Sequence, residues 1–286
     1  MQQTQQAPKA RELQQKIKGI PAADGDGVQL TRIIGSPYLN MLDPFLLLDA
    51  FGSDKPQDYI GGFPPHPHRG FETVTYMLAG KMRHQDSVGN SGVIETGGVQ
   101  WMTAGKGIIH SEMPEQTNGL LAGFQLWVNL PARQKMTAPQ YQEKSADEIP
   151  VEQRENGIEI KVIAGKTSSG TKGIIDNPYI TPTYWDVKQP AGTKLIETIE
   201  RGQNAFVYPF EGEIIVGDSN QSVQKGELAV FEDGDIVSIE TSKDARYLLV
   251  AGKPLNEPVA RGGPFVMNTR EEVQQAFNDY QTGNFI

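Results

Sequence analysis

The chain has 286 residues, of which 37% are hydrophobic and 8% aromatic, and this composition is typical of a folded globular protein. Its net charge of −9, from 26 basic and 35 acidic residues with no basic run, argues against a surface that binds nucleic acid. Because the chain has no cysteine, disulfides, thiolate nucleophiles and sulfur-ligated zinc are excluded.

The start of the chain lacks the charged and then apolar pattern of a secretory signal. The longest apolar run near it, Phe45–Leu48, is too short to cross a bilayer. We therefore expect a soluble, cytoplasmic protein that contacts neither a membrane nor nucleic acid directly.

The 31 glycines and 19 prolines are scattered along the chain and indicate many turns between short elements, which favours an all-β fold. Residues 1–20 are interpreted as an arm or a short helix without chemistry. A strand or an irregular buried segment is expected at 39–51. Other strands of the first half are predicted at 28–34, 71–78, 82–85, 93–95, 99–102 and 123–130.

Residues 131–153 are charged and polar and contain three prolines, so we interpret them as a connector between two halves. We expect one domain at 1–135 and a second at 136–286. The second half has the spacing of another barrel or sandwich, with strands predicted at 158–164, 183–187, 194–198, 205–210, 213–216, 227–230, 236–240 and 246–251.

The tail of the chain predicts a helix. Thr269 and Glu272 have the spacing of a capping box. From Val273 to Tyr280 the apolar residues then recur at helical intervals. We expect a helix over 270–280 whose apolar face packs against a barrel.

Two pairs of metal-binding residue types have one residue between their members: His66 with His68, and His110 with Glu112. Side chains at i and i+2 of a strand point to the same face, so two such pairs on neighbouring strands can bring four ligands together inside a barrel. Pro67 cannot donate a ladder hydrogen bond, which places the first pair at a strand end or an irregular edge. We therefore predict one mononuclear metal site in the first half.

Three neutral imidazoles and one carboxylate suit Fe(II), Mn(II), Ni(II), Cu(II) or Zn(II), and suit Cu(I) and calcium poorly. A structural zinc site is the weaker interpretation, because such sites are typically rich in cysteine. If the metal is six-coordinate, two positions remain for substrate or dioxygen, which favours catalysis or exchangeable binding.

These residues also allow other interpretations. A histidine pair occurs by chance in many proteins, and the second pair is what favours a metal. Glu72 follows His68 by four residues, on the same face by parity, and is a fifth candidate ligand, although a carboxylate hydrogen-bonded behind the ligands is the better interpretation. His84 is interpreted as structural or as a partner of a ligand. No histidine follows His110, so the second half is not expected to hold an equivalent site.

Five long stretches carry a specific pattern: LDPFLLLDAF at 42–51, GGFPPHPHRGFETVTYMLAG at 61–80, QWMTAGKGIIHSEMP at 100–114, FQLWVNLP at 124–131 and GPFVMNTREE at 263–272. With these stretches the chain resembles the pirins, bicupin proteins of the cupin superfamily, over nearly its whole length. The resemblance implies two stacked cupin β-barrels. The N-terminal barrel would carry iron or another divalent metal, and the C-terminal barrel would lack metal ligands and end in a helix.

In pirins the metal ligands fall on the residues that match His66, His68, His110 and Glu112. The general cupin pattern instead places its glutamate a few residues after the histidine pair, which here would be Glu72, and the spacing after Glu72 departs from that pattern by one residue. The resemblance therefore implies Glu112 as the carboxylate ligand. It implies one divalent metal ion, Fe(II) first, with Mn, Ni, Cu or Zn as alternatives.

The resemblance also implies two kinds of function. Some pirins look like quercetin 2,3-dioxygenases, which open the heterocyclic ring of a flavonol with dioxygen and release carbon monoxide. That activity is our first hypothesis, with Glu112 as the catalytic base that takes the proton of the flavonol 3-hydroxyl. The alternative is a non-enzymatic, metal- or redox-responsive regulator that binds transcription factors or metabolic enzymes. A third option is a cupin isomerase that uses the metal as a Lewis acid.

Overall fold

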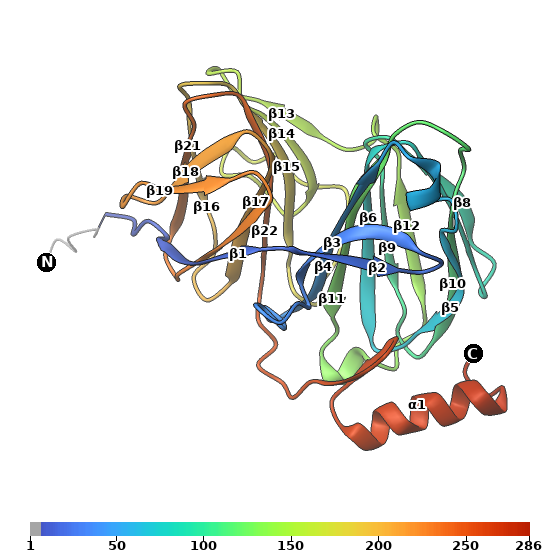
Figure 1. Ribbon diagram of the computed structural model, residues 1–286. Helices are drawn as coiled ribbons and strands as arrows, with labels where there is room; N and C mark the ends of the chain where they lie inside the picture. Colours follow the sequence, from blue (N-terminus) through green and yellow to red (C-terminus); the bar gives the residue numbers. More distant parts are fainter. Residues whose placement is uncertain (1–6) are drawn as a thin grey trace, which may run out of the picture. The chain divides into compact units, whose positions relative to one another are not determined.

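The computed structural model describes residues 7–286 (Figure 1). These residues form two compact units. The histidine unit comprises Gly19–Ile149 and Leu255–Ile286, and the second unit comprises Pro150–Pro254 together with the described residues up to Lys18. No helix among the described residues is long and apolar enough to span a membrane.

The histidine unit is built mainly of strands. They are β2 (Ile20–Asp24), β3 (Val28–Ile34), β4 (Phe45–Ser53), β5 (Phe63–His68), β6 (Phe71–Ala79), β7 (Lys81–Asp86), β8 (Ser91–Glu95), β9 (Val99–Thr103), β10 (Ile108–Pro114), β11 (Leu121–Asn129), β12 (Gln140–Lys144), β23 (Ala260–Gly262) and β24 (Phe265–Met267). The helices are the 3-10 turns Pro56–Asp58 and Ala132–Gln134, and α1 (Arg270–Thr282).

The second unit consists of strands and loops. Its strands are β1 (Leu13–Lys18), β13 (Val151–Gln153), β14 (Glu159–Ala164), β15 (Thr183–Gln189), β16 (Lys194–Thr198), β17 (Asn204–Glu211), β18 (Glu213–Val216), β19 (Gln221–Gln224), β20 (Glu227–Phe231), β21 (Ile236–Glu240) and β22 (Ala245–Gly252). Its interior is filled by apolar side chains, among them Ile160, Val187, Val207 and Leu249.

Within the described residues the two units repeat one arrangement, a seven-stranded sheet with a four-stranded sheet. In the histidine unit the strand orders are β12-β9-β6-β11-β4-β3-β2 and β5-β10-β7-β8. In the second unit they are β1-β20-β17-β22-β15-β14-β13 and β16-β21-β18-β19. The predicted fold class, two β-barrels and a C-terminal helix, is confirmed. The predicted strands of both halves are present, with bounds that agree within two residues, and the segment expected at 39–51 forms strand β4 from Phe45 on.

The domain boundary differs from the prediction at 135/136. The sequence from Leu255 onward, including α1, belongs to the histidine unit and does not end the second unit. β12 lies inside the predicted connector, yet it pairs with β9 and extends the large sheet of the histidine unit. Composition marked this stretch as polar, but its ladder hydrogen bonds decide where it packs.

The N-terminal prediction is also wrong where it can be compared. Residues 1–6 of the predicted arm or helix lie outside the described residues, and β1 is a strand that pairs with β20. Arg11 is fully buried and explains the docking of this segment. Its guanidinium donates to the carbonyl oxygens of Gln203, Glu200 and Glu232 and pairs with the Asp233 carboxylate at 3.2 Å. These contacts compensate a charge that burial would otherwise penalise.

The helix α1 forms as predicted. The Thr269 side chain accepts a hydrogen bond from the backbone N–H of Glu272, and the Glu272 side chain accepts one from the backbone N–H of Thr269, so the capping box is complete. Gly283 ends the helix in the left-handed conformation. Val273 and Ala276 are buried, which confirms that the apolar face packs against the unit.

A buried lysine ties three segments of the histidine unit together. Lys135 is 1% exposed, and its Nζ donates to Gly70 O at 2.7 Å, Asn129 Oδ1 at 2.6 Å and Val266 O at 3.0 Å. Three acceptors match the three N–H groups of an ammonium. Lys135 therefore links the turn after β5, the end of β11 and β24.

We expect Lys135→Met to destabilise the histidine unit by about 2–3 kcal/mol, because it leaves three buried acceptors without a donor. In a unit of this size such a loss lowers the melting temperature by roughly 5–10 °C, measured by calorimetry. Lys144→Met, at an exposed ion pair with Glu148, should shift the melting temperature by about 1–2 °C or less. Equal shifts for the two variants would contradict the assignment.

Candidate metal centre

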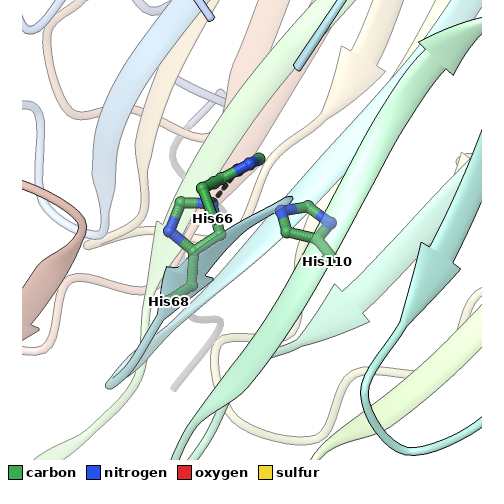
Figure 2. A group of neighbouring side chains, drawn as sticks. All are labelled: His66, His68 and His110. Carbon is green, nitrogen blue, oxygen red and sulfur yellow. Dashed lines mark hydrogen bonds between the residues drawn. The ribbon is translucent and has the colours of Figure 1, made fainter. Parts of the chain in front are cut away.

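The two predicted ligand pairs lie on neighbouring antiparallel strands. β5 and β10 run side by side in the small sheet, with His66 opposite His110 and His68 opposite Ile108 (Figure 1). His68 is the last residue of β5, so the prediction that the first pair lies at a strand end is confirmed. Figure 2 shows the three imidazole rings gathered around one point.

The rings of His66 and His68 are held through their Nδ1 atoms. His66 Nδ1 lies 2.8 Å from Pro64 O, and His68 Nδ1 lies 3.3 Å from Pro264 O. A carbonyl oxygen only accepts, so each Nδ1 carries the hydrogen and donates it. The two Nε2 atoms then face each other 3.0 Å apart as lone pairs, an arrangement that a shared cation satisfies.

The ring of His110 is held in a comparable way from the other side. His110 Nδ1 lies 3.5 Å from His84 Nδ1, and His84 Nε2 lies 3.4 Å from Asp86 Oδ2. Because a carboxylate accepts, His84 donates from Nε2 and accepts at Nδ1, which leaves the hydrogen of His110 on Nδ1. Buried His110 Nε2 has no hydrogen-bond partner among the described residues.

Electrostatics keeps the buried rings in the form that binds metals. Burial, and next the neighbouring His66, hold the pKa of His68 well below its ordinary value. Burial, followed by the other three imidazoles, does the same to the pKa of His110. Both rings are therefore neutral at physiological pH, and a neutral imidazole is a metal ligand.

His66, His68 and His110 each offer a ligand atom, and these atoms lie within 4.8 Å of one another. Among the described residues they form the one group of three or more histidine, cysteine or acidic side chains that meets this condition. Three tethered imidazoles, an orphaned buried nitrogen and two opposed lone pairs fit a divalent first-row metal.

Glu112 lies close to this group but not inside it. Its side chain is buried; Thr75 Oγ1 donates to Oε1 at 2.7 Å, and Gln125 Nε2 donates to Oε2 at 3.5 Å. It lines the same cavity as His66 and His68. The structure therefore brings the three predicted histidines together and places the predicted carboxylate at the wall beside them.

The parity argument for Glu72 is wrong. Gly70, at φ 87°, interrupts the extended backbone between β5 and β6, so the alternation of side chains between the two faces does not continue from His68 into β6. Thr75 faces the cavity, and Glu72, three residues earlier on the same strand, points to the opposite face. There its carboxylate accepts from Thr103 Oγ1 at 2.7 Å.

His66 and His68 line a cavity of about 680 Å³. Its wall is largely apolar and includes Phe51, Phe63 and Trp127, while Arg32 and Asp49 contribute a partly buried ion pair to the lining. This size and lining are typical of sites for small organic ligands. The arrangement can hold a metal, a proton-accepting carboxylate and a flat apolar molecule together.

Several residues of the site were not found from the sequence. Thr75 and Gln125 lie on predicted strands, but only strand pairing shows that they reach Glu112. Pro264 and Arg261 come from the far end of the chain and also line the cavity. For Thr75, the alternation of side chains along its strand could have indicated that it faces the cavity. For Pro264 and Arg261, no sequence pattern indicates that they reach the site.

Comparison with known proteins identifies the family. The Pirin family model matches residues 27–128, and the Pirin C-terminal cupin domain matches residues 184–286. A pirin-like protein from Caulobacter vibrioides is 54% identical, over 94% of this chain and 97% of its own length. The chain belongs to the pirin family. The chain is accordingly a bicupin.

Other pirin relatives carry names that refer to an activity. A Pseudomonas aeruginosa relative, provisionally named as a quercetin 2,3-dioxygenase, is 47% identical over 93% of this chain and 94% of its own length. The crystal structure of a quercetin 2,3-dioxygenase from Acinetobacter baumannii matches with a TM-score of 0.88 at 36% identity. The match covers 96% of this chain and 98% of that one.

We expect metal binding to depend on the three histidines. Wild-type protein treated with chelator and reloaded should take up about one Ni(II) per chain, measured by elemental analysis. His66→Ala and His110→Ala should each weaken Ni(II) binding at least 100-fold, more than the roughly 10–100-fold expected for loss of a residue behind the ligands. Gln85→Ala, an exposed position on β7, is the control and should bind like wild type. Unchanged binding in both histidine variants would contradict the site.

Proposed function

We propose that this pirin is a metal-dependent dioxygenase of the quercetin 2,3-dioxygenase type, with His66, His68, His110 and Glu112 as the metal ligands. The observation that carries the proposal is the convergence of three imidazoles on one point, where His66 and His68 line a largely apolar cavity. The names of its relatives support the substrate class, a flavonol, with dioxygen as the second reactant.

Fe(II) is our first choice of metal, with Mn, Ni, Cu or Zn as alternatives, because imidazole and carboxylate donors suit all of them. When bound, such an ion supplies Lewis acidity that lowers the pKa of a coordinated hydroxyl and promotes the reaction with dioxygen. The overall reaction consumes one flavonol and one dioxygen, opens the heterocyclic ring and releases carbon monoxide.

Glu112 is proposed as the residue that accepts the proton of the flavonol 3-hydroxyl. It is buried, it lines the cavity, and of the two carboxylates considered from the sequence it is the one on the cavity side. Hydrogen bonds from Thr75 and Gln125 fix the orientation of its carboxylate. A carboxylate oriented in this way inside the cavity can serve as the proton acceptor of a general-base step.

The apolar wall has two roles in the proposal. Phe51, Phe63 and Trp127 provide surfaces on which a flat aromatic substrate can stack. The same residues exclude water, which strengthens the electrostatic interactions of the substrate oxygens and protects reactive species from hydrolysis. The cavity volume lies within the range of pockets that bind small organic ligands.

We expect metal-loaded protein to consume oxygen when quercetin is added, measured with an oxygen electrode across Fe(II), Mn(II), Ni(II) and Cu(II). Glu112→Gln should lower the rate by about 100-fold or more, since it removes the proton acceptor. Glu72→Gln is the matched control and should retain most of the activity, because Glu72 is absent from the cavity wall.

The same experiment separates the alternatives. Oxygen uptake absent with all four metals would rule out the dioxygenase and favour the metal-responsive regulator. Turnover of a substrate without oxygen uptake would favour the isomerase. Greater loss of metal in Glu72→Ala than in Glu112→Ala would assign the carboxylate ligand to the general cupin position.

A further inference from the structure

The three residues that leave β5 are all held by the C-terminal segment, Leu255–Ile286. The His68 imidazole donates to Pro264 O at 3.3 Å, and the backbone N–H of Val266 donates to Arg69 O at 3.0 Å. At Gly70 a β-carbon would lie 2.0 Å from Val266 O, so the two backbones are in direct contact.

The Arg69 side chain extends the same contact to the helix and the tail. It is 4% exposed, and its Nη1 donates to Asp279 Oδ2 of α1 at 2.6 Å. Its Nη2 donates to Phe285 O at 3.3 Å, its carbon Cζ lies 4.5 Å from the centre of the Phe285 ring, and its Nε donates to Lys106 O. Each of the three guanidinium nitrogens thus donates a hydrogen bond, which fixes the orientation of the group.

A second chain of contacts joins this segment to His68 through the cavity wall. The Arg261 guanidinium lies over the Trp127 ring at 4.9 Å, and the Trp127 ring meets the His68 ring edge-on at 5.2 Å. Arg261 and Pro264 both line the cavity. The segment therefore contacts His68 at its ring nitrogen, at the next residue in the chain and across an aromatic neighbour.

These contacts matter because His68 is the last residue of its strand. The ladder with β10 stops at His68, so β10 does not fix the residues that follow. Arg69 instead pairs with Phe265 of β24, and the Gly70 N–H donates to Gly105 O at 2.8 Å. The direction of Nε2 depends on the partner of Nδ1, and groups of this kind behind a ligand tune metal affinity. The hydrogen bond to Pro264 O holds the His68 imidazole with its Nε2 at 3.0 Å from His66 Nε2.

We propose that the C-terminal segment is a brace of the metal centre, and that Arg69 and Asp279 are positioning residues that act on the metal through His68. This inference rests on the metal site of the proposed function. It assigns a role in the metal centre of the histidine unit to the C-terminal segment, although this segment follows the second unit along the chain.

The test is Asp279→Ala with Glu271→Ala as its control. Both remove one acidic side chain from α1, but Glu271 is exposed in the first turn, whereas Asp279 binds Arg69. We expect Asp279→Ala to weaken Ni(II) binding by about tenfold and to change the absorption spectrum of the Co(II)-loaded protein, which reports ligand geometry. Glu271→Ala should match wild type in both.

The measurements are made at 10 °C on protein shown to be folded by circular dichroism, so that a lower melting temperature alone does not change them. If Asp279→Ala fails to fold, Asp279→Asn, which keeps the shape and an acceptor oxygen, takes its place with a smaller expected loss. Ni(II) affinity within twofold of wild type would overturn the brace while leaving the metal site intact. A wild-type protein that binds no metal would overturn both.

Discussion

Every feature of the candidate site depends on where three imidazole rings place their hydrogens. Each ring uses Nδ1 as a donor: His66 to Pro64 O, His68 to Pro264 O and His110 to His84. Burial keeps His68 and His110 neutral, so the remaining nitrogens present lone pairs to one another. Lone pairs gathered in this way repel unless a cation lies between them. The fold therefore holds these nitrogens in an arrangement whose electrostatic repulsion a bound metal ion would relieve.

The two units show how one architecture can be used for packing or for chemistry. Both combine a seven-stranded with a four-stranded sheet, but the second unit fills its interior with a continuous apolar cluster. The histidine unit instead keeps a cavity of about 680 Å³ with polar groups in its wall. Buried polar groups are costly unless they are hydrogen-bonded or bind a ligand. In the histidine unit, hydrogen bonds to the residues of the site compensate the burial of the polar side chains Thr75, Gln125, His84 and Asp86.

The candidate metal site and the apolar wall beside it are built from distant parts of the chain. β5 and β10 supply the three histidines, β6 and β11 supply the donors to Glu112, and the segment after Leu255 supplies Pro264 and Arg261. The family model of the C-terminal cupin domain extends to residue 286, yet residues from Leu255 on belong to the histidine unit. Boundaries drawn along the sequence and boundaries drawn by packing therefore differ in this protein.

The sequence by itself determined many of the strands, the capped start of the helix at Arg270 and the two residue pairs of the candidate site, because periodicity, capping and i, i+2 spacing are local properties of the chain. These local rules failed where a turn interrupts a strand and where segments far apart in the chain pair with each other. Gly70 interrupted the alternation on which the placement of Glu72 rested, and β1 joined the second unit through pairing with β20. Only the tertiary structure decided that Pro264 orients His68 from 196 residues away, and that His84 stands behind His110. Such contacts depend on which surfaces pack together, and the order of residues along the chain does not encode that packing in any short pattern.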